Sequence, residues 1–171
     1  MVAVVRIRRL EPHEVALHRQ VRLRALRDAP DAFGETAADV EARPSSYWEQ
    51  LTQSVTEPGR HVMFLASEED AICGSTYGLL DVESNDAGRV GGTWVAPSHR
   101  RRGVGKALVD AVISWAREHG FGRVRLWAPA ASTAALALYR RAGFLETGRS
   151  RPFPTNAALQ IVELECMLST Q

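Results

Sequence analysis

An arginine run followed by two glycines is the part of this sequence best suited to chemistry. Arg100, Arg101 and Arg102 precede Gly103 and Gly105, directly after an apolar stretch and directly before an amphipathic one. The pattern predicts a strand, a tight basic turn and then a helix. Such a turn directs several backbone N–H groups, and the positive end of the helix dipole, toward one place. The segment therefore predicts a phosphate site, and with it a phosphate-bearing cofactor.

Two common phosphate loops do not fit this segment. A Walker A loop needs Gly, four residues and then Gly-Lys-Ser/Thr, whereas Gly105 and Lys106 are followed by Ala107, and Arg100 stands at the first Gly position. The dinucleotide fingerprint needs a third Gly or Ala three residues after the second Gly, and that position is Leu108. The sequence therefore excludes both motifs.

The elements around the loop follow from hydrophobic spacing and turn residues. Strands are expected over residues 4–10, 61–67, 71–82, 88–95, 123–127, 144–148 and 160–168. Helices are expected over residues 14–28, 104–119 and 132–141, with a shorter one capped by Ser45 or Ser46, and a loop is expected over residues 149–157. The strand–helix–strand unit that follows three consecutive strands requires a parallel pair with a right-handed crossover. This order predicts an α/β protein, with an α+β mixed sheet of about seven strands and helices on both faces.

The composition limits the class of protein. The chain has 171 residues, of which 45% are hydrophobic and 24% charged, as expected for one globular domain over residues 1–171. A formal net charge of +1, and the lack of aromatic residues among the arginines, argue against a nucleic-acid partner. Cys73 and Cys166 lie in apolar stretches and are expected to be reduced and buried. Neither a signal peptide nor a membrane span is evident, so a cytoplasmic protein without a membrane partner is expected.

A second motif makes a family resemblance specific. Residues 100–105 read Arg-x-x-Gly-x-Gly after a strand that ends in Val-x-Pro, which resembles the acyl-CoA-binding motif of the GNAT superfamily of N-acetyltransferases. Residues 132–144 resemble that family's Asn-x-x-Ala-x-x-Leu-Tyr-x-x-x-Gly-Phe, with Ser in place of Asn. One helix and one strand separate the two motifs, as in the family. The expected order of elements also matches over nearly the whole chain.

The resemblance implies a GNAT-like sheet with a splayed parallel strand pair and acetyl-CoA as co-substrate, without a metal. Backbone N–H groups of residues 101–106 would bind the pyrophosphate, and Gly103 and Gly105 would allow its close approach because neither has a Cβ. The residues implied in cofactor binding are Trp94, Val95, Arg100, Arg101, Arg102, Gly103, Val104, Gly105, Lys106, Ser132 and Tyr139.

The same resemblance places the pantetheine arm in a slot between two strands. One strand ends at Val95, and its splayed neighbour is expected over residues 123–127. Gly91 and Gly92 would bend the first strand into a bulge, or would only relieve crowding against a helix. A backbone N–H near Val95 would hydrogen-bond the thioester oxygen as charge develops on it.

The reaction implied is transfer of the acetyl group of acetyl-CoA to a primary amine of a small molecule. Tyr139 occupies the position of the family's general acid and would protonate the departing thiolate, although core packing would also explain a Tyr on an amphipathic helix. Ser132 could bond the pantetheine or cap its helix.

The general base is not evident from the sequence. Many members of the family carry a Glu on the strand before Val-x-Pro, but residues 87–95 contain no acid. The candidates elsewhere are Asp81, Glu83, His99 and Glu35. A water chain, or an amine with a lowered pKa, would make a dedicated base unnecessary.

The acceptor site is expected between the first two helices and the loop before the last strand. Its expected lining is residues 33–35, Tyr47, Trp48 and residues 151–154, although aromatic residues there would also suit the core. Two alternatives stay open: a protein or peptide N-acetyltransferase that acts on an N-terminus or a lysine, and a non-catalytic acyl-CoA-binding sensor. The apolar residues of the last strand also permit a homodimer.

Overall fold

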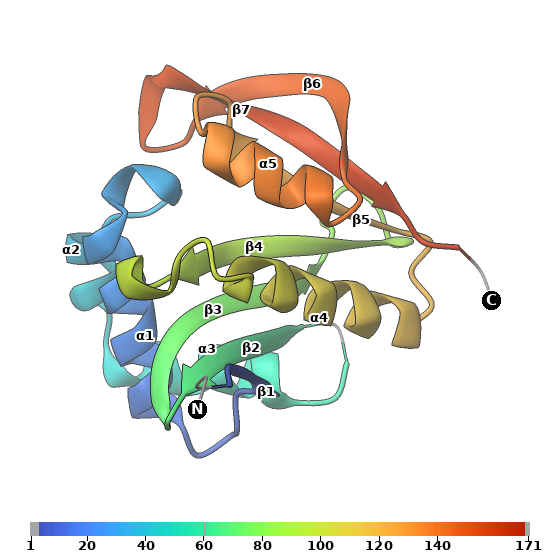
Figure 1. Cartoon of the computed structure of the whole chain (residues 1–171). Helices are drawn as coiled ribbons and strands as arrows, with labels where there is room; N and C mark the ends of the chain where they lie inside the picture. The colour runs from blue at the N-terminus through green and yellow to red at the C-terminus, as the bar shows by residue number, and fades with distance from the viewer. Residues whose placement is uncertain (1–3, 60, 170–171) are drawn as a thin grey trace.

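The computed structural model describes residues 4–59 and 61–169, which form one seven-stranded sheet with helices packed on it (Figure 1). The strands are β1 Arg6–Arg9, β2 Val62–Glu68, β3 Ala71–Leu80, β4 Ala87–Val95, β5 Arg123–Pro129, β6 Leu145–Phe153 and β7 Asn156–Met167. The helices are α1 Val15–Asp28, α2 Ala37–Glu41, α3 Ser45–Thr56, α4 Val104–Glu118 and α5 Thr133–Arg141, with 3-10 turns at Pro30–Ala32 and Pro97–His99.

The sheet is mixed, which confirms the expectation from the sequence. Its strand order is β1-β2-β3-β4-β5-β7-β6, and every neighbouring pair is antiparallel except β4 and β5. Figure 1 shows α4 and α5 in front of the sheet and α3 behind it, so helices cover both faces. No helix within the described residues is long and apolar enough to cross a membrane.

The parallel pairing of β4 with β5 is very short. Only Ala87–Gly88–Arg89 pair with Arg123–Val124–Arg125, although both strands continue well past this point. We call these three pairs the seam. Beyond the seam the two strands diverge, and the edge that each turns toward the other has no strand partner. The splayed pair implied by the sequence resemblance is therefore present.

Helix α4 packs on the sheet beside the diverging strands through one apolar face. Val104, Leu108, Val112 and Trp115 recur at helical spacing and are buried. Gly78 of β3 makes room for Trp115, because a Cβ at this position would lie 2.8 Å from a carbon of the ring, and Gly74 makes room for Leu108 in the same way, at 3.0 Å. Small residues in β3 therefore let α4 pack closely on this strand.

Three details differ from the sequence prediction. The loop expected over residues 149–157 is mostly strand, because β6 continues to Phe153 and β7 begins at Asn156. Pro152 fits there because β6 is the edge strand, where a missing N–H removes no hydrogen bond from a further neighbour. The short helix α2 was not predicted, and α3 takes Pro44 as its N-cap residue rather than either serine.

Both cysteines are buried free thiols, as the sequence predicts. Burial is the main cause that raises the pKa of Cys73 and of Cys166 above the usual range of a thiol. Raised pKa values keep both groups protonated, so neither is activated as a nucleophile.

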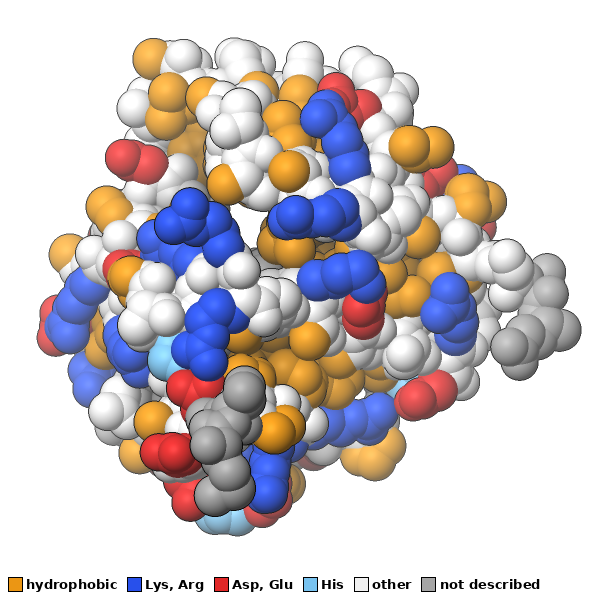
Figure 2. Space-filling view, in the orientation of Figure 1, with side chains coloured by type: hydrophobic (Ala, Val, Ile, Leu, Met, Phe, Trp, Pro, Cys, Tyr) orange, Lys and Arg blue, Asp and Glu red, His pale blue; other side chains and the backbone are white. Residues whose placement is uncertain are grey.

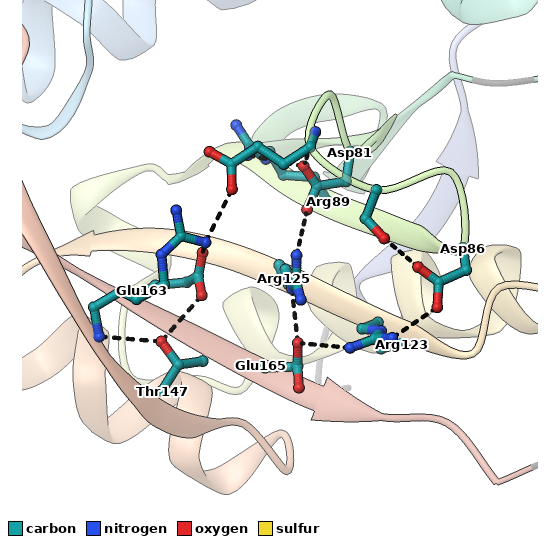
Figure 3. Close-up of polar contacts among 11 residues, drawn as sticks. Asp81, Asp86, Arg89, Arg123, Arg125, Thr147, Glu163 and Glu165 are labelled. Atoms are coloured by element: carbon teal, nitrogen blue, oxygen red, sulfur yellow. Dashed lines mark hydrogen bonds and ion pairs between the residues drawn. The ribbon is translucent and has the colours of Figure 1, made fainter.

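A network of charged side chains crosses the seam on the face opposite α4 and α5 (Figure 3). Arg89 and Arg125 stand opposite each other in the parallel pair. Asp81, only 1% exposed, lies between them as a shared counter-charge: its Oδ1 lies 3.1 Å from Arg89 and its Oδ2 lies 3.6 Å from Arg125. Arg125 also donates to Glu165 of β7 over 2.7 Å. The network therefore ties β4, β5 and β7 together where the slot closes.

Replacing Asp81 by Asn should lower the free energy of unfolding by about 3 kcal/mol, since it leaves two facing arginines without their shared counter-charge. This value is at the low end for a broken buried pair, because Arg89 and Arg125 keep some access to solvent. Urea denaturation measures the loss.

Asp86→Asn is the matched control. Asp86 pairs with Arg123 of the same network, but its side chain is 58% exposed, so its loss should be much smaller. Equal losses in the two variants would contradict the role given to Asp81.

Candidate active site

The slot between β4 and β5 is closed at the seam and open at the ends of the two strands. The loop of residues 96–103 leaves β4 at the open end and leads into α4. On the other side β5 leads into α5, which carries Tyr139. Figure 2 shows Lys and Arg side chains gathered around the hollow in the middle of this face. The structure therefore brings the two sequence motifs to the same opening.

The loop presents backbone N–H groups at the start of α4. Arg101 and Gly103 have positive φ values of 59° and 82°, and Gly103 is the N-cap residue. The first helical hydrogen bond runs from the Ala107 N–H to the Gly103 carbonyl, so the three N–H groups of residues 104–106 precede it. Nothing lies within 4 Å of a Cβ built at Gly103. These groups and the open space beside them suit an anion at the positive end of the helix dipole.

The basic side chains of the loop mostly have partners in the protein. Arg100 donates to the Val95 carbonyl over 3.0 Å and also pairs with Asp28 of α1. Arg102 pairs with Glu68 over 2.6 Å. Two of the three arginines therefore brace the loop, and its N–H groups are its more direct means of binding phosphate.

Gly105 also has a packing role, in addition to the close approach of a ligand that the resemblance implies. A Cβ at Gly105 would lie 3.1 Å from Leu138 of α5 and 3.6 Å from Val95. The missing side chain therefore lets α4 approach α5 and the end of β4. This contact lies at the open end of the slot.

The bulge expected from two adjacent glycines is present in β4. Tyr77 pairs with Gly91 and Ser75 with Trp94, so β4 holds one residue more than β3 over this stretch. Gly92 takes a φ of +59°, and a Cβ there would lie 2.8 Å from the Tyr77 ring. The extra residue removes backbone groups from the β3–β4 ladder beside the slot. The Gly91 carbonyl accepts from the Thr76 hydroxyl over 3.3 Å, and the remaining freed groups are suited to a ligand.

Tyr139 reaches β4 near this bulge. Burial raises the pKa of the Tyr139 hydroxyl, and a hydrogen bond with Thr93 only partly opposes the shift. Thr93 in turn shares a 2.8 Å hydrogen bond with Thr76 of β3, and the Tyr139 ring packs edge-on against Phe144. A phenol in this environment keeps its proton at neutral pH and can donate it. Thr93 was not singled out by the sequence, because only the folded sheet brings it to Tyr139.

Two other residues of the implied cofactor set have clear structural roles. Ser132 caps α5, since its side chain accepts the Ala135 N–H at 3.3 Å. Trp94 is buried, with its indole N–H donating to Asp28 over 2.9 Å. Its side chain thus anchors β4 to α1, and only its backbone is suited to a ligand in the slot.

All four candidates for the general base already have a charged partner: each of the three acids pairs with arginine, and His99 pairs with a glutamate. Asp81 belongs to the network at the seam, and Glu83 pairs with Arg149 over 2.9 Å. His99 lies 3.0 Å from Glu68 beside the loop. Glu35 accepts from both Arg22 and Arg43. Within residues 4–59 and 61–169 no group of three or more His, Cys, Asp or Glu residues is placed to hold a metal ion.

A cavity of about 300 Å³ lies beside the bulge, on the face of the sheet that carries α1 and α3. Glu35, Tyr47 and Trp48 line it, as expected for an acceptor site. The other lining residues come from α1, α3, β3, β4 and the segments before α3 and β2: Arg22, Arg43, Leu51, Ser54, Val55, His61, Tyr77, Leu79, Gly91 and Gly92.

Phe33, Gly34 and residues 151–154, which were also expected in this lining, do not line the cavity. Arg151 instead stacks on Trp127, 4.2 Å from the ring centre, and Pro154 lies against Gly34. Arg22 and Arg43 were missed, because an arginine on an amphipathic helix or in the turn between α2 and α3 also suits an ordinary exposed surface.

A neutral histidine lies behind the cavity wall and hydrogen-bonds to one of its lining residues, Tyr77. His18 is fully buried between Thr52 and the Tyr77 hydroxyl, at 2.9 and 2.7 Å. Burial, with a smaller contribution from the nearby Arg22, lowers the pKa of His18 to about 4. The ring is therefore uncharged at neutral pH and acts as a hydrogen-bonding spacer that positions Tyr77.

A larger hollow of about 660 Å³ lies elsewhere, along α1. Arg24, Arg27, Trp94 and Pro97 are among its lining residues, and neither Tyr139 nor the bulge glycines are. The smaller cavity is the better candidate for an acceptor, because it adjoins the bulge.

Comparison with known proteins agrees with this geometry. The sequence model of the Acetyltransferase (GNAT) family matches residues 23–144. An aminoglycoside N(6')-acetyltransferase type 1 from Stenotrophomonas maltophilia is 31% identical over 153 residues, which cover 84% of this chain and 88% of that protein.

Solved structures share the fold over nearly the whole chain. An acetyltransferase of the GNAT family from Streptococcus pneumoniae superposes with a TM-score of 0.80 at 20% identity, covering 97% of this chain and 100% of that one. A putative acetyltransferase from Salmonella typhimurium, solved with its cofactor acetyl-CoA, gives a TM-score of 0.75 at 16% identity, covering 99% of this chain and 96% of that one.

Proposed function

This chain belongs to the GNAT family of acetyltransferases, and we propose that it transfers the acetyl group of acetyl-CoA to the primary amine of a small molecule. The observation that carries the proposal is the slot itself. It has N–H groups at its open end, Tyr139 on one wall and a bulged strand with an adjoining cavity on the other. One relative, matched over 88% of its own length, is named as an aminoglycoside acetyltransferase, and an aminoglycoside is a small amine.

The loop suits the pyrophosphate of acetyl-CoA. The N–H groups of residues 101–106 would bind it, and the open space beside Gly103 would allow its close approach. The backbone of Trp94 and Val95 would pair with the pantetheine arm along the free edge of β4. Arg100, Arg102 and Lys106 would surround this opening with their charges balanced by Asp28, Glu68 and Asp110, so they would shape the site while the N–H groups bind the phosphate.

The transfer forms a bond from the amine nitrogen to the acetyl carbon and breaks the bond from that carbon to sulfur. A backbone N–H of the bulged stretch, residues 92–95, would stabilise the charge that develops on the thioester oxygen. Tyr139 would give its proton to the leaving thiolate, and its raised pKa keeps that proton in place until then.

The amine must lose one proton before or during the attack. Glu35 is the one candidate base that lines the cavity beside the bulge, but two arginines already neutralise it. We therefore assign this proton to solvent water rather than to a dedicated carboxylate.

Replacing Gly103 by Ala should weaken acetyl-CoA binding about tenfold, because a side chain strains the left-handed backbone and displaces N–H groups that bind a charged partner. Titration calorimetry measures the change. Gly120→Ala is the matched control: Gly120 also has a positive φ and open space around it, but it ends α4 far from the loop. Equal loss of affinity in both variants would contradict the loop assignment.

Release of free thiol from acetyl-CoA in the presence of amines tests the function. Tyr139→Phe should lower kcat by about 100-fold or more, because the thiolate then leaves without its acid. The Kd for acetyl-CoA should change little, since the ring stays in place. An unchanged kcat across the pH range would remove the acid role from Tyr139. Tight acetyl-CoA binding without thiol release for any amine or peptide would indicate a sensor instead.

A further inference from the structure

We propose that the acceptor is an α-amino acid, and that Arg22 binds the carboxylate next to the reacting amine. This inference rests on the proposed N-acetyltransferase function and names the chemical class of its acceptor. Four features of the cavity beside the bulge support it: an unused donor, a net positive charge, the position of that donor and the size of the space.

The first feature is a buried donor on Arg22. Its Nε and Nη2 both donate to Glu35 Oε1, at 3.0 and 2.6 Å. Its Nη1 is buried and has no hydrogen-bond partner within the described part of the chain. The indole N–H of Trp48, which also lines the cavity, is buried and unpartnered in the same way. Buried donors without acceptors are costly, so a ligand with acceptor atoms would be favoured here.

The second feature is the charge of the cavity. Glu35 is the one acidic residue among the described lining residues, and both of its oxygens are engaged, Oε1 by Arg22 and Oε2 by Arg43. Two arginines against one carboxylate leave one positive charge. An ammonium group would find no free carboxylate here, whereas a ligand carboxylate would find a charged donor.

The third feature is the position of Arg22. Its Nη1 lies 3.1 Å from where a Cβ at Gly92 would be, so the free donor adjoins the bulge. The guanidinium is held there between Phe33 and Tyr77, 4.9 and 5.9 Å from their ring centres. The amine of an α-amino acid is separated from its carboxylate by one carbon. A carboxylate on Arg22 therefore holds the amine beside the bulge, where the acetyl group is expected.

The fourth feature is the size and lining of the space. At about 300 Å³ the cavity is at the lower end of the range for ligand sites, which suits a single amino acid. Leu51, Val55 and Leu79 supply an apolar wall for its side chain. A lysine side chain or a protein N-terminus carries no free carboxylate next to its amine, so the same features disfavour a protein acceptor.

Three related acceptors test the inference with the wild-type protein: leucine, leucinamide and isopentylamine. They share the amine and the apolar group, but only leucine has the carboxylate. Thiol release should give leucine a kcat/KM about tenfold or more above the other two, as expected for one hydrogen-bonded charge pair. Equal or better use of leucinamide or isopentylamine would overturn the inference while leaving the N-acetyltransferase function intact.

The Arg22→Gln variant extends the test to the protein. It should lower kcat/KM for leucine about tenfold or more, leave leucinamide little changed and leave the Kd for acetyl-CoA unaltered. Arg27→Gln is the matched control, since Arg27 is an exposed arginine of the same helix paired with Glu41. A similar loss for leucine and leucinamide in Arg22→Gln would overturn the role of Arg22. Failure of the wild type to bind acetyl-CoA would instead overturn the proposed function.

Discussion

The early divergence of β4 from β5 is the constraint on which the rest of the site depends. Three residue pairs join the strands, and past them each strand turns toward the other a backbone edge that has no strand partner, with the Val95 carbonyl taken by Arg100. Backbone N–H and C=O groups rarely stay without partners, so water or a ligand must satisfy these edges. A ligand with amide groups along an extended arm matches this requirement. The slot is therefore a consequence of the sheet's topology rather than of any one side chain.

The two ends of the slot are held by different forces. At the closed end, Asp81 lies between Arg89 and Arg125 and offsets their repulsion, which lets two like charges face each other across the seam. At the open end, small residues decide the geometry. Gly105 lets α4 approach α5, and Gly92 allows the bulge that brings β4 close to Arg22. Charge pairing thus stabilises the sheet where the strands part, and missing side chains allow close packing around the open end.

Local patterns were enough to predict the parts of the site that come from continuous segments. The loop before α4, the capping Ser132 and the bulge at Gly92 each follow from residues adjacent in sequence. The network at the seam could not be predicted, because Asp81 and Arg125 are brought together only by the order of the strands. Arg22 was missed for a related reason: its free donor is evident only when Glu35 and Gly92 are seen around it. The extent of β6 also depended on its pairing with β7, which overrides the turn propensity of Pro152.

Hydrogen exchange measured by NMR, with and without acetyl-CoA, tests the central claim most directly. The claim is that the diverging edge of β4 and the start of α4 bind this one ligand together. Acetyl-CoA should slow exchange of the N–H groups in residues 92–95 and 101–106, and leave those of β1 and β2 unchanged. Binding of acetyl-CoA without protection of these two segments, or with protection confined to the hollow along α1, would contradict the account.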